Sequence, residues 1–108
     1  MTIYALSSGS GISGIAVIRI SGPETREIIT KMTSGSFPKE KQATLKKINK
    51  IDTKELIDQG IIIWFPGPQS YTGEDMAEFH VHGSRAVIEA IHTSISKIEN
   101  CRPAEPGE

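Results

Sequence analysis

Three side chains with metal- or ligand-binding chemistry alternate along one short segment: Glu78, His80 and His82. Successive side chains of a strand point to opposite faces of the sheet. On the strand predicted over Ala77 to Val81, the three side chains therefore share one face. Two imidazoles and a carboxylate could form a metal site, or the polar face of a strand that contacts an organic ligand.

The residues around this segment leave the choice open. Glu74 and Asp75 lie close by in the sequence and could add carboxylate ligands to a metal. Phe79 and Val81 alternate with the polar residues and would supply a core-facing side, as on any half-exposed strand. The pattern favours a ligand-facing strand over a metal site, and an ordinary surface strand is the remaining alternative.

Arg19 is a second residue of interest, because it interrupts the apolar, β-branched run Ile15 to Ile20. A buried guanidinium without a partner would be strongly destabilising, so Arg19 must be paired. One interpretation is a salt bridge to an acidic neighbour. The other is a planar fork that binds a carboxylate or carbonyl of a ligand. The position of Arg19 supports both equally.

The segment Gly9 to Gly14 reads G-x-G-x-x-G and follows a predicted strand. This dinucleotide fingerprint requires a helix after the last glycine, whose N-terminus receives the pyrophosphate. Here the run Ile15 to Ile20 predicts a strand instead. We therefore expect a connection between strands and no dinucleotide site.

Asn49-Lys50-Ile51-Asp52 matches the N-K-x-D sequence with which many GTPases recognise guanine. No G-x-x-x-x-G-K-[ST] phosphate-binding loop occurs in the 108 residues, so we expect no GTP binding or hydrolysis by this chain alone. Cys101 has no activating neighbour in the sequence and is interpreted as an ordinary thiol.

Composition predicts one small soluble domain over residues 1–108, with 12 Lys and Arg against 13 Asp and Glu and a net charge of −1. A single cysteine excludes an internal disulfide framework, and the absence of a signal peptide points to the cytoplasm. No apolar run approaches the roughly 20 residues that span a bilayer, so no membrane partner is expected. The near-zero charge gives no footprint of a dedicated nucleic-acid binder.

The elements that must position these residues predict an α+β fold: a mixed, mostly antiparallel sheet of about five strands with two helices. Ser21 and Glu24 fit a capping box for a helix that ends near Met32, and Ser84 opens a second helix to about Ile98. Ile57 to Phe65 has no polar face and is expected to be the most buried strand. The tail from Arg102 to Glu108 has no element of its own and reads as a cut end. The other predicted strands are Thr2 to Leu6, Ile15 to Ile20, Ala43 to Ile48 and Ala77 to Val81.

Several motifs, in order along the chain, carry a family resemblance. They are G-I-A-V-I-R-I-S-G (14–22), W-F-P-G-P-Q-S-Y-T-G-E-D (64–75), Glu78, His82-Gly83 and R-P-A-E-P-G-E (102–108). Together they resemble the N-terminal domain of the MnmE (TrmE) family of tRNA modification GTPases. The chain departs from the family in residues 7–14, where a T-P-P-G-R-G-G-like turn is usual.

The resemblance implies a domain that dimerises and binds 5-formyltetrahydrofolate or a related folate, with a fold similar to the folate-binding aminomethyltransferase of glycine cleavage. It assigns the folate contacts to Arg19 and Glu78. It also implies that the complete protein works with the flavoprotein MnmG on the wobble uridine of certain tRNAs. GTP, Mg²⁺ and K⁺ would act in a G domain that these residues lack.

Two other classes of function compete with this one. The chain could be a purely structural dimerisation module, or a small metal-dependent enzyme built on Glu78, His80 and His82. Folate titration separates the first from a folate-binding domain, and elemental analysis separates the second.

Overall fold

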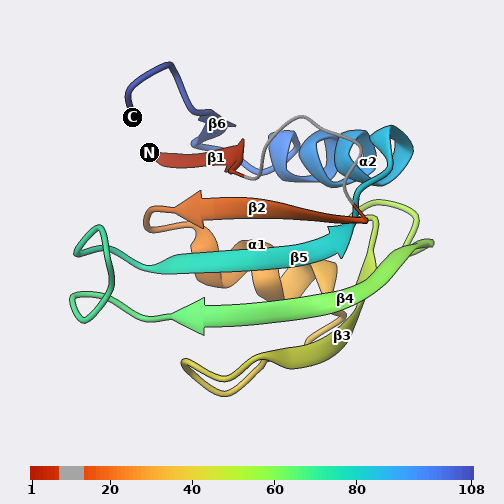
Figure 1. Cartoon of the computed structure of the whole chain (residues 1–108), viewed down its shortest axis with the longest axis horizontal. Coiled ribbons are helices and arrows are strands. Elements are labelled where there is room, and N and C mark those ends of the chain that lie inside the picture. Colours follow the sequence, from red (N-terminus) through yellow and green to blue (C-terminus); the bar gives the residue numbers. More distant parts are fainter. Residues whose placement is uncertain (8–13) are drawn as a thin grey trace.

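The computed structural model describes residues 1–7 and 14–108, which form one sheet and two helices (Figure 1). The predicted G-x-G-x-x-G connection falls largely on residues 8–13 and lies outside the described residues. In chain order the elements are β1 (Thr2–Leu6), β2 (Ile15–Ser21), α1 (Thr25–Met32), β3 (Thr44–Asn49), β4 (Leu56–Phe65), β5 (Met76–His82), α2 (Arg85–Ser96) and β6 (Cys101–Pro103).

The sheet has six strands in the order β3-β4-β5-β2-β1-β6. Neighbouring strands pair antiparallel except β1 and β6, which are parallel. The predicted α+β class and mostly antiparallel sheet are therefore confirmed. The sequence missed β6, because three residues that end in a proline show no periodicity; the parallel partner β1 is what makes Cys101–Pro103 a strand.

One face of the sheet carries the hydrophobic core. Figure 1 shows α1 behind β5 and β4, and both helices bury their apolar side chains among alternate strand residues. Cross-strand pairing places Ile18, Phe79 and Ile62 side by side in the centre of that face, and all three are fully buried. We call this the covered face, and the opposite side of the sheet the open face.

Helix α1 begins differently from the prediction. Ser21 belongs to β2 and does not cap the helix; Glu24 occupies the N-cap position, without a capping side-chain bond. The buried Thr2 hydroxyl instead donates to Glu24 Oε1 (2.7 Å) and accepts from the Glu24 amide (2.8 Å). A partner distant in sequence has thus replaced the local capping box.

Helix α2 follows the prediction closely. Ser84 is its N-cap, and the serine hydroxyl accepts a hydrogen bond from the Val87 amide at 3.1 Å. The helix ends at Ser96, near the predicted end, and buries Ile91 and Ile95.

Strand β4 is in the sheet interior, but the prediction that it is the most buried strand is wrong. Gly60, Ile62 and Trp64 are buried on the covered face, whereas Ile61, Ile63 and Phe65 remain partly exposed on the open face. Helices cover only one side of this sheet, so an apolar run buries every second residue. Strand β5 has the larger share of buried residues.

Within the part of the chain that the structure describes, no helix is both long and apolar enough to cross a membrane.

Candidate functional site

A row of polar side chains crosses the centre of the open face. Arg19 on β2 and Glu78 on β5 are direct cross-strand partners, and Arg19 Nε lies 3.0 Å from Glu78 Oε2. The second carboxylate oxygen, Oε1, lies 2.9 Å from His80 Nε2. The Glu78 side chain is only 18% exposed, against 31% for His80 and 54% for Arg19. One carboxylate is therefore held between two basic groups.

The alternation of the strands explains this arrangement. Arg19, Glu78 and His80 occupy the positions between core residues, so burial of Ile18, Ile20 and Phe79 forces them onto the open face. Of the two interpretations of Arg19, the salt bridge to an acidic neighbour is present in the structure, and the ligand-binding fork stays a prediction.

Apolar residues flank the row. Ile63 lies opposite Glu78 on β4, Ile61 lies opposite His80, and Val17 lies opposite His80 on β2. All three are partly exposed. The polar row thus crosses a largely apolar surface, which is the usual composition of a site for a small organic molecule.

Two cavities open beside this row, under the loop between β4 and β5. The first, of about 620 Å³, is lined by residues that include Glu78, Arg19, Lys41 and Tyr71. The second, of about 310 Å³, lies toward β1 and also contacts Arg19 and Tyr71. Arg19 and Tyr71 therefore border both cavities, and Glu78 borders the larger one.

Hydrogen bonds to the end of β2 hold the loop over the cavities. Ser21 Oγ lies 2.9 Å from Thr72 Oγ1 and donates to Glu74 Oε2 at 3.0 Å. The Asp75 carbonyl accepts from the Gly22 amide, and its carboxylate accepts from the Gly67 amide at 2.9 Å.

Gly22 also has a steric role at this point. Its φ is +142°, and a Cβ there would lie 2.4 Å from Thr2 Oγ1. The R-I-S-G and G-E-D motifs are distant in sequence and form one anchored corner.

His82 is separate from the row. Its backbone amide and its ring Nδ1 both contact the Asp58 carboxylate, at 2.8 Å each. Burial alone raises the pKa of Asp58, but the backbone and ring hydrogen bonds from His82 lower it below its usual value. Of the three alternating residues, Glu78 and His80 lie in the row with Arg19, and His82 contacts Asp58 of β4 instead. Across residues 1–7 and 14–108, no three His, Cys, Asp or Glu side chains are grouped to hold a metal ion.

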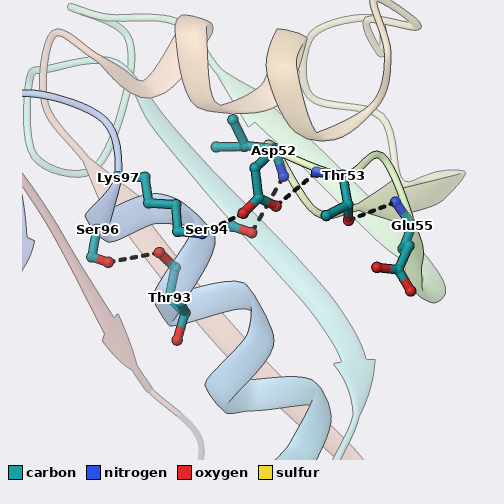
Figure 2. Close-up of polar contacts among 8 residues, drawn as sticks. Asp52, Thr53, Glu55, Thr93, Ser94, Ser96 and Lys97 are labelled. Atoms are coloured by element: carbon teal, nitrogen blue, oxygen red, sulfur yellow. Dashed lines mark hydrogen bonds and ion pairs between the residues drawn. The ribbon is translucent and has the colours of Figure 1, made fainter.

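The N-K-x-D match does not form one recognition surface. Asn49 Nδ2 points toward Ser34 Oγ at 3.4 Å, whereas Asp52 accepts from Lys97 of α2 and from the Thr53 amide (Figure 2). These hydrogen bonds, from Lys97 first and then from Thr53, lower the pKa of Asp52. Asn49 and Asp52 thus contact different parts of the protein.

Cys101 fits the interpretation as an ordinary thiol. Burial, reinforced by the charges of Glu24 and Glu27, raises the pKa of this thiol to about 11, so it stays protonated and unreactive at neutral pH.

The terminal R-P-A-E-P-G-E segment makes specific contacts with itself and with β1. Arg102 donates to both carboxylate oxygens of Glu108, at 2.6 Å each, and the Glu105 amide contacts the same carboxylate. The hydrogen bonds from Arg102 and from the Glu105 amide lower the pKa of Glu108 to about 2. The Ala104 amide donates to the Tyr4 carbonyl, which extends the contact with β1. Glu108 thereby comes to line the smaller cavity.

Two residues at the cavities had no assigned role in the sequence. Tyr71 belongs to the W-F-P-G-P-Q-S-Y-T-G-E-D motif and is 94% exposed. Lys41 lines the larger cavity from a turn with φ of +61°, and only the tertiary fold brings it there.

Comparison with known proteins shows which family the chain belongs to. The family model described as "GTP-binding protein TrmE N-terminus" matches residues 2–108. The chain belongs to the TrmE N-terminal family. The resemblance inferred from the sequence is thereby confirmed.

Individual relatives extend the comparison. The tRNA modification GTPase MnmE of Pelagibacter ubique is 68% identical to the chain. The match covers the whole chain and 24% of that relative. The mitochondrial 5-taurinomethyluridine-[tRNA] synthase subunit GTPB3 of Danio rerio is 48% identical to the chain. This match covers 99% of the chain and 21% of that relative. The chain thus spans about a quarter of the length of these TrmE-family relatives.

Proposed function

We propose that this chain is a folate-binding and dimerisation domain that acts in tRNA modification. The observation that carries the proposal is the Glu78 carboxylate, fixed between Arg19 and His80 at the edge of a cavity of about 620 Å³. The names of two relatives, a tRNA modification GTPase and a 5-taurinomethyluridine-[tRNA] synthase subunit, support the part of the proposal that concerns tRNA modification.

The chemistry of a pterin fits this carboxylate. A pterin presents its ring N–H and its 2-amino group as two parallel donors, and an ionised carboxylate accepts both. Each oxygen of Glu78 has one protein partner and keeps further lone-pair capacity. The ligand would be 5-formyltetrahydrofolate or a related folate, and Arg19 would contact it from the side shared by both cavities.

The test is a calorimetric titration of 5-formyltetrahydrofolate into the chain and into its Glu78→Gln variant. The amide replaces one acceptor oxygen by a donor that faces a donor, so affinity should fall roughly ten- to a hundredfold. Glu27→Gln is the matched control: the substitution is the same, on an exposed α1 residue paired with Lys31. Equal affinities of the Glu78 variant and the unmodified chain would remove Glu78 from the site. Absence of binding by the unmodified chain would favour a structural module.

The open face supports dimerisation. Helices leave its isoleucines partly exposed, and Leu45, opposite Ile61, is 59% exposed. A second copy related by a two-fold axis would cover this apolar area. We expect a dimer in sedimentation at micromolar concentration, weakened by Leu45→Lys and unaffected by Ala86→Lys on the exposed side of α2. A monomer at high micromolar concentration would contradict this.

The remaining roles belong to a complete protein. There the domain would act with the flavoprotein MnmG on the wobble uridine of tRNA in the cytoplasm, while GTP, Mg²⁺ and K⁺ bind a separate G domain. The chain alone should release no phosphate from GTP, and Asp52→Asn should change nothing. Turnover that Asp52→Asn abolishes would overturn this.

A further inference from the structure

We infer that His80 is a positioning residue for Glu78, one that fixes the carboxylate in the orientation a ligand with two N–H donors requires. The inference deepens the proposed function and rests on it. His80 Nε2 lies 2.9 Å from Oε1, and Arg19 Nε lies 3.0 Å from Oε2. Arg19 reaches the carboxylate from β2 and His80 reaches it from β5. Together the two contacts restrain the rotation of the carboxylate about χ3, which is otherwise broad in glutamate.

The hydrogen bond to Glu78 also determines the tautomer of the His80 imidazole. An ionised carboxylate only accepts hydrogen bonds, so neutral His80 must carry its hydrogen on Nε2. Val17 and Ile61 flank the ring on the neighbouring strands, and Glu78 is the polar side chain it contacts.

His82 lies on the same strand and the same face as His80, so the tautomers of the two rings can be compared. Its Nδ1, and not its Nε2, contacts a carboxylate, that of Asp58 at 2.8 Å. The neutral ring of His82 must therefore carry its hydrogen on Nδ1. Two histidines two residues apart thus adopt opposite tautomers, and only His80 acts on Glu78.

The first experiment measures this difference without any ligand. Long-range proton–nitrogen NMR spectra of the imidazoles, recorded at about pH 8 where unperturbed histidines are neutral, distinguish the tautomers. We expect His80 protonated on Nε2 and His82 on Nδ1. A His80 ring protonated on Nδ1 would overturn the inference whether or not a folate binds.

The second experiment measures the effect on binding of 5-formyltetrahydrofolate. His80→Phe keeps the ring and removes the donor, so affinity should fall roughly three- to tenfold. His80→Gln keeps an N–H donor and should restore affinity to within about twofold. His82→Gln, which leaves the Glu78 carboxylate untouched, is the matched control and should bind normally.

The outcomes separate this inference from the proposed function. If His80→Phe binds as tightly as the unmodified chain while Glu78→Gln does not, His80 has no positioning role and the folate site stands. Equal losses in the Phe and Gln variants would also overturn the positioning role. If the unmodified chain binds no folate, the proposed function fails, and the tautomer of His80 then decides whether it orients Glu78.

Discussion

The two faces of one sheet are built from the same strands and have opposite uses. On the covered face, Ile18, Phe79 and Ile62 lie side by side and are fully buried. On the open face, one position along each strand, Arg19, Glu78 and Ile63 lie side by side and are reached by solvent. The stability of the fold depends on the first row, and the ligand binding that we propose depends on the second.

The difference comes from the helices and not from the strand sequences. Strand β4 offers apolar side chains to both faces, and only the side packed by α1 and α2 becomes core. An apolar side chain on the open face therefore remains available for a ligand or a second copy, while its neighbours in the chain are committed to the fold.

The largest effect that tests this division is expected from Phe79→Ala. Phe79 is fully buried, so its truncation removes apolar area and leaves a cavity, which costs about 3–5 kcal/mol of the free energy of unfolding. Chemical denaturation of the variant and the unmodified chain measures the loss.

Its matched controls are the two residues beside it on the open face. Glu78→Gln, which keeps the size of the side chain, and Ile63→Ala should each cost clearly less than Phe79→Ala, because both positions are only partly buried. A loss for Ile63→Ala as large as that for Phe79→Ala would show that the open face is also core.

A smaller effect is expected from Thr2→Val at the edge of the covered face. Valine keeps the shape but removes the hydroxyl that bonds both the carboxylate and the amide of Glu24. An amide left without its acceptor in a partly buried place costs about 1–3 kcal/mol. Denaturation measures this cost, and Thr2→Ser, which keeps the hydroxyl, should recover most of it. Equal losses in the two variants would mean that the methyl group, and not the Glu24 contact, is what matters.

The same residues show how far the sequence predicts the fold. Helix α2 and the core strands were predictable because local signals and periodicity agree with the tertiary structure, as at Ser84. The start of α1 was not, because its partner Thr2 lies 22 residues away. Which side of β4 is covered, and the short strand β6, also depend on contacts between distant segments.

The candidate site was predictable in its parts more than in its connections. Arg19 stood out as a charge in an apolar strand and Glu78 as part of an alternating polar pattern. Pairing of Arg19 with an acid was one of two interpretations that the sequence supported equally. The sequence placed His80 and His82 on one face but gave no sign that they use different carboxylates. That distinction depends on Asp58, which β4 brings to His82 from 24 residues away.

The smallest expected effect concerns a histidine on the covered side. His92 of α2 packs edge-on against Tyr4, with ring centroids 5.2 Å apart. Its Nε2 is buried and has no hydrogen-bond partner among the described residues. Burial lowers the pKa of His92 below its ordinary value, since a charged ring there would lose its hydration.

The pH dependence of stability follows from that lowered pKa. In the unfolded chain His92 takes up a proton near pH 6.5, whereas in the folded chain it does so only at lower pH. The unfolded state therefore binds more protons in that interval, so the contribution of His92 to stability is complete above pH 6.5 and is lost as the pH falls below it.

His92→Phe keeps an aromatic ring against Tyr4 and cannot titrate. Denaturation at pH 7.5 and pH 5.5 should then show a smaller loss of stability on acidification for His92→Phe than for the unmodified chain. Equal losses of the free energy of unfolding in the two proteins would contradict this prediction. They would mean that the His92 ring is protonated as easily in the folded chain as in the unfolded one.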